Sequence, residues 1–323
     1  MKVSIAMATY NGAQYIHAQL QSFIEQTRLP DELIISDDCS TDRTQAIIRE
    51  FAAVAPFKVE LHCNRENLGY CGNFNEALMK TNGDLVFLSD QDDVWFPEKI
   101  EYMLSVAESN PKALLLMNDA AITDSELNGF ELTKIGQILS AGFSVDGFVM
   151  GCCCTIRREL LDICLPIVSG FKAHDDWIVE FAESLSVKMV DPTVLQYYRR
   201  HESNVSQVIV NRTTRVNRRT VFFHRVKTLF DKKESDRLQL YLKQRSIFAD
   251  GITRARSKAP DEMFEQLLCL ERKVREQVKT AEKRIHIREK RFISRVGSVL
   301  LLLKQGDYKN SSGKKSALKD IVG

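Results

Sequence analysis

The sequence predicts an α/β fold, in which a mostly parallel sheet with flanking helices is followed by a helical C-terminal region. Short apolar runs alternate with segments of helical periodicity four times within residues 1–110. This pattern is typical of strand–helix–strand units with right-handed crossovers. Beyond about Ser206, Gly and Pro become scarce while Lys and Arg recur among Leu, Ile, Val and Phe, which indicates helices.

Each element of the first 110 residues has a local signal. Apolar alternation or a short apolar run predicts strands at Val3–Met7, Leu33–Ile35, Val59–Leu61 and Leu85–Leu88. Apolar residues at helical spacing predict helices at Ile16–Ile24, Ile47–Phe51, Phe74–Leu78 and Ile100–Ala107. Pro30 stops the first helix and Pro97 marks the start of the fourth. Further short strands are expected near Phe148–Ile156 and Val187–Val190.

Charge divides the chain into two regions. Residues 1–198 hold 14 Lys+Arg and 29 Asp+Glu, a net charge of −15, whereas residues 199–323 hold 31 and 14, a net charge of +17. We therefore expect a catalytic, nucleotide-binding domain over residues 1–205 and a basic, mainly helical region over residues 206–323.

Several classes of protein are disfavoured. The eight cysteines form no C-x-x-C pair, so we expect neither a disulfide framework nor a zinc site, and a reducing cytosol is the simplest location. No signal peptide is expected, and the longest largely apolar run, Val296–Leu303, is far shorter than a membrane-spanning helix. The dinucleotide and P-loop glycine motifs are absent, which argues against a dehydrogenase.

The strongest chemical signal is the acidic run that follows the fourth strand. Asp90 and Asp92 are two residues apart, so in an extended chain their carboxylates share a face. Such a pair at a strand end suits Mg²⁺ or Mn²⁺ shared with a diphosphate. The alternative is an acidic turn that caps the following helix. The position after a buried strand favours the metal site, because parallel sheets bind ligands beyond the carboxyl ends of their strands.

Other polar groups lie at the same edge of the predicted sheet. Asp37 and Asp38 follow the second strand and could accept hydrogen bonds from a base or a ribose, although helix capping is an alternative. Arg65 follows the third strand and could pair with phosphate or stack on a base. It could equally be an ordinary solvated arginine.

Two later clusters complete the candidate site. Asp175 and Asp176 could supply the base that an attacking hydroxyl needs, and the alternative is a helix N-terminus that favours acidic residues. Deciding between the two aspartates is not possible from the sequence. His201 could ligate a metal or hold a diphosphate, or it could be a lone surface histidine.

Taken in order, these motifs resemble those of the inverting family 2 glycosyltransferases of the GT-A fold, over roughly residues 1–204. The segments that carry the resemblance are Met7–Asn11, Ser36–Asp42, Asn67–Gly69 with Asn73, Asp90–Asp92, His174–Trp177 and Tyr198–His201. The D-Q-D-D-x-W and H-D-x-W pair is most similar to enzymes that build bacterial O-antigen or capsule repeat units. Asp176 departs from the aromatic residue common there.

The resemblance implies roles for individual residues. Asp38 would contact the nucleotide base, Asp90 the ribose and Asp92 the metal, with Asp90 and His201 as further metal ligands. Asp175, or else Asp176, would be the general base. The full set expected to contact the nucleotide sugar is Thr9, Tyr10, Asn11, Asp38, Arg65, Asn67, Asn73, Asp90 and Trp95.

The predicted function is therefore transfer of one sugar (a hexosyltransferase-like reaction) from a nucleotide sugar to a glycan acceptor, with Mn²⁺ or Mg²⁺ as cofactor. We expect a polyprenyl-diphosphate-linked acceptor of O-antigen or capsule synthesis, and a cytoplasmic, peripheral location on the inner face of the membrane. The basic region would dock on anionic lipid through Val296, Val299, Leu300 and Leu303, or through Phe222, Phe223, Val226 and Leu229. The alternative is a helical bundle that packs against the acidic N-terminal domain and neutralises it within one molecule. The alternatives are an inactive GT-A scaffold and a nucleic-acid-binding protein, and the acidic N-terminal region argues against nucleic acid as a partner.

Overall fold

The computed structural model describes residues 1–202, 204, 209–222 and 234–322. It divides into two compact units. The first comprises Met1–Ile167 and Lys172–Val221, and the second comprises Val168–Phe171 and Phe222–Gly323. Phe223, Val226 and Leu229 lie outside the described residues.

The first half of unit 1 is the predicted series of strands and helices. Its strands are β1 (Val3–Thr9), β2 (Glu32–Asp37), β3 (Lys58–Cys63) and β4 (Leu85–Ser89). They are parallel and lie in the order β3-β2-β1-β4. Its helices are α1 (Ile16–Ile24), α2 (Thr44–Ala52), α3 (Gly69–Lys80) and α4 (Lys99–Ser109). The predicted alternation is confirmed for all eight elements.

The second half extends the same sheet beyond β4 in the order β8-β6-β9-β5, with β7 on β6. The strands are β5 (Val94–Trp95), β6 (Leu115–Thr123), β7 (Gly129–Thr133), β8 (Cys154–Arg157) and β9 (Lys188–Arg199). The helices are α5 (Lys134–Ser140), α6 (Arg158–Cys164) and α7 (His174–Ser184). The strand expected over Phe148–Ile156 begins only at Cys154, because two 3₁₀ turns, at Val145–Gly147 and Gly151–Cys153, occupy most of that segment.

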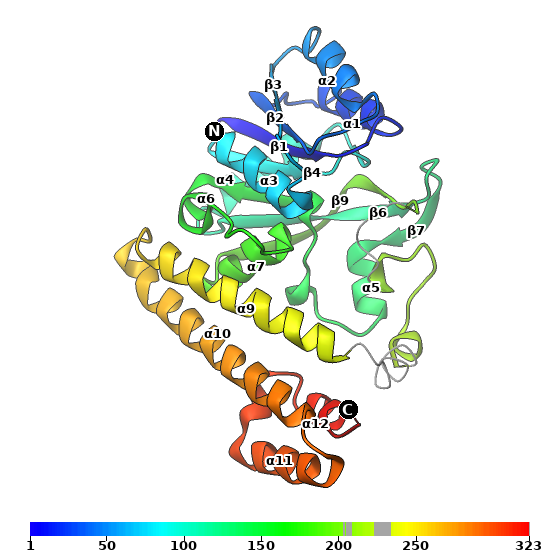
Figure 1. The fold of residues 1–323 in the computed structure, drawn as a ribbon. Coiled ribbons are helices and arrows are strands. Elements are labelled where there is room, and N and C mark those ends of the chain that lie inside the picture. Colours follow the sequence, from blue (N-terminus) through cyan, green and yellow to red (C-terminus); the bar gives the residue numbers. More distant parts are fainter. Residues whose placement is uncertain (203, 205–208, 223–233, 323) are drawn as a thin grey trace. The chain divides into compact units, whose positions relative to one another are not determined.

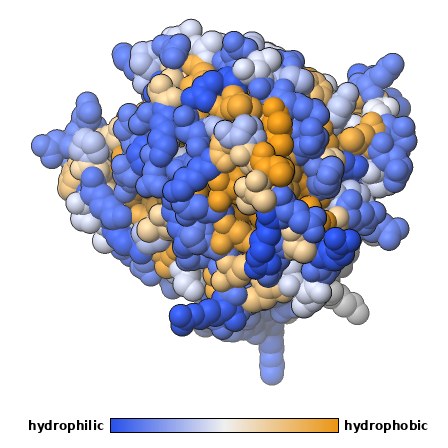
Figure 2. Space-filling model, turned by 90° about the horizontal axis from the view of Figure 1, so that it is seen from above, coloured by the Kyte–Doolittle hydropathy of each residue, from blue (hydrophilic) through white to orange (hydrophobic). Residues whose placement is uncertain are grey.

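Side chains from both faces of the sheet are buried. On one face Val3, Ile5 and Met7 of β1 join a cluster with apolar residues of α1, α2 and α4. The strand period of two turns Ala6 to the opposite face, where α3 neighbours β1 and β2, and α7 neighbours α3. The surface that results is largely hydrophilic, with hydrophobic side chains gathered near the middle of the face shown in Figure 2. The loops at the edge of the sheet are therefore attached to strands that are packed on both faces.

Unit 2 is helical, as predicted. Its helices are α9 (Glu234–Arg256), α10 (Asp261–Arg288), α11 (Phe292–Gln305) and α12 (Lys314–Val322). The long helices α9 and α10 pack side by side (Figure 1), and Glu271 of α10 bonds Arg256 and Thr253 of α9. Within the described ranges, no helix has the length and apolar character needed to cross a membrane.

Candidate active site

The carboxyl ends of β1 and β4 form the switch point of the sheet, where the strand order reverses. One side chain ties the loops after these strands together. The Gln91 side chain accepts a hydrogen bond from the backbone N–H of Tyr10 (2.9 Å) and donates one to the backbone carbonyl oxygen of Tyr10 (3.1 Å). Gly12 makes this possible, because a Cβ there would overlap the Gln91 amide. The half-exposed Tyr10 side chain is left at the surface of the junction.

Asp37 and Thr9 form a buried anchor below the edge. The Asp37 carboxylate is fully buried and accepts hydrogen bonds from Thr9 Oγ1 (2.9 Å), Ser40 Oγ (2.6 Å) and Gln45 Nε2 (2.6 Å). Asn11 holds the same turn from the other side, because its Oδ1 accepts a hydrogen bond from the backbone N–H of Thr41 (2.8 Å). These contacts fix the loops after β1 and β2 against each other.

Asp38 holds the loop that precedes α3. One carboxylate oxygen accepts the backbone N–H of Leu68 (2.8 Å) and the other accepts that of Gly69 (2.9 Å). This arrangement uses donors that a helix N-terminus leaves without internal partners. Gly69 has a φ of +72°, which explains the glycine. Asn64 Nδ2 also donates to the first of these oxygens (3.0 Å). A carboxylate oxygen has two acceptor positions, so the second oxygen keeps one for a ligand.

Asn67 and Arg65 belong to this loop, whereas Asn73 belongs to α3. Asn73 is buried, and it donates from Nδ2 to the Thr9 carbonyl oxygen (3.0 Å). Asn67 donates to the Asp38 carbonyl oxygen (3.3 Å) and accepts from the Gly69 N–H (3.1 Å). The Arg65 side chain is exposed. Asn67 thus joins the loops after β2 and β3, Asn73 joins α3 to β1, and the Arg65 side chain is open to solvent.

The turn after β4 brings Asp92 to His201, although the two lie 109 positions apart in the sequence. Asp92 Oδ2 is 2.7 Å from His201 Nε2 and 3.1 Å from Asn204 Nδ2. The His201 ring stacks on Tyr15 with 4.6 Å between ring centroids. Arg199 fixes the turn further by donating from Nε to the Asp92 carbonyl oxygen (2.7 Å). Two of the predicted metal ligands therefore meet.

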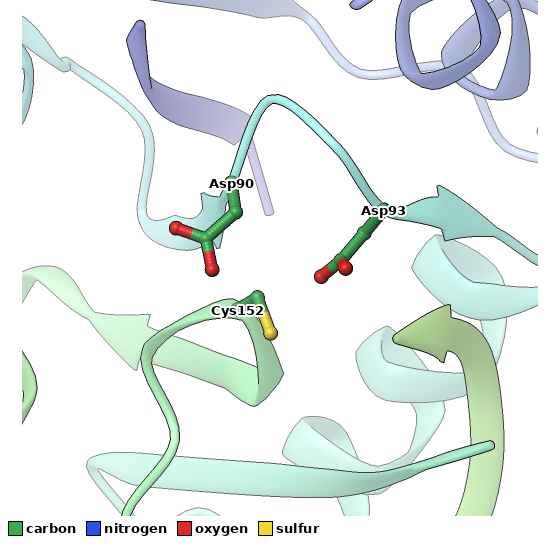
Figure 3. Close-up of side chains that lie close together, drawn as sticks. All are labelled: Asp90, Asp93 and Cys152. Carbon is green, nitrogen blue, oxygen red and sulfur yellow. The ribbon is translucent and has the colours of Figure 1, made fainter. Parts of the chain in front are cut away.

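Asp90, the third predicted ligand, belongs to a neighbouring group. One carboxylate oxygen of Asp90, one of Asp93 and the Cys152 sulfur all lie within 4.8 Å of one another. Figure 3 shows these side chains converging from two loops. Burial raises the pKa of Asp90 well above its usual range. Burial also raises the pKa of Asp93, to about 7, and the charge of Asp92 adds to this. Clustered carboxyl groups of this kind gain from a nearby cation.

Trp95 has a different environment from the expected one. It is 2% exposed and packs in the core against Phe23 and Phe87, with ring centroids 4.8 Å and 5.7 Å away. Its indole N–H is buried and has no hydrogen-bond partner among the described residues. The ring therefore supports the turn after β4 from below instead of lining an open surface.

Asp175 and Asp176 occupy the first turn of α7, where the helix dipole favours negative charge. Asp175 is half-buried, and its charge is one of those that raise the pKa of Asp90. Asp176 is exposed, and its backbone N–H donates to Asp175 Oδ1 (3.0 Å). Of the two, Asp175 is thus the one electrostatically linked to the acidic turn after β4.

His174 underlies this helix start. It is 5% exposed and its ring stacks on Phe74 with 3.9 Å between centroids. Neither ring nitrogen has a hydrogen-bond partner within the described part of the chain, and burial lowers the pKa of the imidazole. Gly151 is packed directly against the ring, since a Cβ there would lie 2.6 Å from His174 Nε2. The 3₁₀ turn that carries Cys152 therefore also supports Asp175.

The sequence analysis missed a buried polar chain behind the acidic turn. Lys99 is fully buried and donates from Nζ to the Cys152 carbonyl oxygen (3.1 Å) and to Gln196 Oε1. Gln196 Nε2 donates in turn to Asp93 Oδ2 (3.0 Å). A lysine at the start of a helix is ordinarily solvated, so no local signal marks Lys99. Asp93 was visible in the acidic run, but its partner lies 103 positions away.

Comparison with known proteins identifies the first unit. The family described as Glycosyl transferase family 2 matches residues 4–164. The chain is 29% identical over 218 residues to the dTDP-rhamnosyl transferase RfbG of Shigella flexneri, covering 61% of this chain and 72% of that protein. It is 31% identical over 127 residues to WfgD of Escherichia coli, named as UDP-Glc:alpha-D-GlcNAc-diphosphoundecaprenol beta-1,3-glucosyltransferase, covering 39% and 49%.

Solved structures agree on the fold. The crystal structure of S. aureus TarS 1-349 in complex with UDP-GlcNAc covers 100% of this chain and 90% of that chain, with a TM-score of 0.55 and 17% identity. The GT-A fold expected from the motifs is confirmed. Residues 4–164 form a domain of glycosyltransferase family 2.

Proposed function

We propose that the chain transfers one sugar from a nucleotide-sugar donor to a glycan acceptor in a single, inverting displacement. One observation carries the proposal. The turn after β4 joins Asp92 to His201 at 2.7 Å, at the switch point of the sheet, and Asp175 acts on the same turn electrostatically. Groups for a leaving diphosphate and for an attacking hydroxyl therefore share one edge.

The donor would lie across the loops after β1, β2 and β3. Asp38 fixes the loop that carries Arg65, and Asn73 ties α3, which follows that loop, to the Thr9 carbonyl oxygen of β1. This leaves Tyr10, Asn11 and Arg65 exposed at the same edge. Arg65 could take the diphosphate or stack on the base. Asp90, beside the acidic turn, could accept from the ribose.

The donor set of the acidic turn fits a divalent cation. Asp92 offers a carboxylate oxygen and His201 an imidazole nitrogen, and together with diphosphate oxygens they suit Mn²⁺ or Mg²⁺. When bound, such an ion stabilises the negative charge that develops on the leaving nucleoside diphosphate. Cys152 is a poorer candidate ligand for a hard cation, because burial raises the pKa of its thiol well above its usual range and keeps it protonated.

Asp175 would take the proton of the attacking hydroxyl. It lies in the first turn of α7, and the backbone N–H of Asp176 orients one of its oxygens. Asp176 is exposed and stays the second candidate. A one-step displacement requires a base and no protein nucleophile, and it inverts the anomeric centre. His174 takes up no proton from the hydroxyl in this scheme, because burial lowers the pKa of its imidazole.

The acceptor class comes from the relatives. RfbG is named for transfer of rhamnose from dTDP-rhamnose, and WfgD for transfer of glucose to a diphosphoundecaprenol-linked sugar. We therefore propose a lipid-linked acceptor of bacterial surface polysaccharide synthesis, and a site of action at the inner face of the membrane. The match spans 72% of RfbG and 49% of WfgD. The proposal therefore names the class of acceptor, and it carries over neither the sugar nor the linkage of these relatives.

A donor panel tests the proposal. The full chain is incubated with UDP-glucose or dTDP-rhamnose, with Mn²⁺ or with EDTA, and release of the nucleoside diphosphate is measured together with the thermal midpoint. We expect one donor to raise the midpoint in Mn²⁺, since a ligand stabilises the state that binds it, and to be turned over slowly. No shift and no release with either donor would favour the inactive scaffold. Binding of DNA or RNA at physiological salt would favour the nucleic-acid alternative.

A further inference from the structure

Helix α11 exposes an apolar face. Ile293 is 86% exposed, Phe292 61%, Leu300 58% and Leu301 55%. In a helix of 3.6 residues per turn, positions 293, 300 and 301 lie on one side. A helix side that faces water is ordinarily polar. The outer side of α11 therefore fits an apolar environment.

The opposite side of α11 is packed. Val299 and Leu302 are buried in a small cluster with Ile287, Tyr308 and Ala317. This corrects the apolar strip expected from the sequence, because Val299 faces inward, whereas Ile293 and Leu301 face outward. Phe222 of the other expected strip is 61% exposed, and the remaining three residues of that strip lie outside the described part.

Buried polar contacts hold the cluster together. Asp320 of α12 bonds Arg284 Nε (2.7 Å) and Arg288 Nη1 (3.2 Å) of α10, and it accepts from Tyr308 Oη (2.9 Å). Gly306 ends α11 in the left-handed region with a φ of +80°. The orientation of α11 within unit 2 is thus determined by packing of its inner side against α10, α12 and Tyr308, and its outer face is preformed.

Positive charge surrounds this face. Residues 290–304 contain Lys290, Arg291, Arg295 and Lys304 and no acidic residue. No ion pair to any of these four occurs within the described ranges. A second copy of the chain would bring the same charges together, which disfavours self-association through this face. Anionic headgroups complement the charges, and the acyl boundary beneath them accepts the apolar side chains.

We propose that α11 lies in the headgroup region of an anionic membrane, with Ile293, Leu300 and Leu301 directed toward the acyl chains. This inference deepens the proposed function, because an enzyme with a lipid-linked acceptor must work at a membrane surface. It assigns the contact to α11, where the sequence left two apolar strips as alternatives, and it places Ile293 and Leu301 on the contact face in place of Val299. Lys290, Arg291 and Lys304, at the two ends of α11, contact the headgroups.

Vesicle flotation tests the assignment. The full chain is mixed at low salt with vesicles of phosphatidylcholine and phosphatidylglycerol, or of phosphatidylcholine alone, and the bound fraction is measured. We expect binding to the anionic vesicles only. The Ile293→Ser, Leu300→Ser double variant should bind at least about tenfold more weakly, since two large apolar side chains no longer enter the bilayer. The thermal midpoint should stay unchanged because both side chains are exposed.

The matched control is Val54→Ser in unit 1, which removes a side chain that is 75% exposed and should leave binding intact. Equal binding of the double variant and the wild type would overturn the proposal. So would a concentration-dependent dimer, seen by light scattering, that the double variant abolishes. Nucleotide release from the donor panel reports separately on the proposed function. Membrane binding through α11 without any release would refute the proposed function and leave the membrane assignment standing.

Discussion

A methyl group added at Gly151 tests how Asp175 is positioned. A Cβ at this position would lie 2.6 Å from His174 Nε2, 3.3 Å from Cε1 and 3.7 Å from Asp175 Cβ. Ordinary van der Waals contact begins near 3.4 Å, so the ring or the 3₁₀ turn must move by about 1 Å. The ring has little room, because its other face stacks on Phe74 at 3.9 Å.

Two effects of Gly151→Ala follow, and both have an expected size. Overpacking a core of this kind destabilises a protein by about 1–3 kcal/mol. A displacement of about 1 Å at a catalytic group lowers turnover by about 10²-fold. Since the donor loops after β1, β2 and β3 are not involved, donor binding should change little. We therefore expect a lower kcat at an almost unchanged KM for the donor, and a lower thermal midpoint.

The control is Gly147→Ala in the preceding 3₁₀ turn, where an added Cβ meets nothing within 4 Å. It should have wild-type kcat and stability. His174→Ala in the Gly151→Ala background removes the clash and should restore part of kcat. Wild-type turnover of Gly151→Ala would refute the reasoning, because Asp175 would then not depend on this contact.

Three further predictions concern the acidic groups. Asp92→Asn should reduce Mn²⁺-dependent turnover by about 10²-fold or more, and full activity of wild type in EDTA would contradict a metal role. Asp175→Asn should slow transfer by about 10²–10⁴-fold with donor affinity nearly intact, and the same loss in Asp176→Asn alone would move the base by one residue. Burial raises the pKa of Asp93 to about 7 from 3.8, so its contribution to stability is complete below about pH 4 and is lost as the pH rises through 7. Without metal, Asp93→Asn should therefore have a higher thermal midpoint than wild type at pH 8 but not at pH 4. The same difference in midpoint at both pH values would contradict a raised pKa for Asp93.

The first half of the fold was predictable because the apolar residues of each strand and helix recur at the spacing of that element and are buried in the core. The alternating Val3, Ile5 and Met7 and the helical spacing of Ile16 and Leu20 meet in the same cluster. The second half was predicted only in part. The strand expected near Val187–Val190 is present as β9, but β8 runs antiparallel between β4 and β6, and the Gly151–Cys153 turn replaces the first part of a predicted strand. Such pairings depend on contacts distant in sequence, which periodicity does not report.

The same distinction applies to the site. The sequence indicated which acidic residues lie at the sheet edge, and the structure joins Asp92 to His201 there. It could not indicate that Trp95 is enclosed by Phe23 and Phe87, nor that Lys99 is buried behind the acidic turn. Both facts arise from tertiary packing, which gives a residue a different environment from the one that its type suggests.

The stereochemistry of transfer tests the central claim most directly. A donor of known anomeric configuration is turned over by the wild-type chain, and the configuration of the new glycosidic bond is determined by NMR. Single displacement with Asp175 as base predicts a product whose anomeric configuration is opposite to that of the donor. A product that retains the donor's configuration would contradict the account, because retention does not arise from one in-line attack.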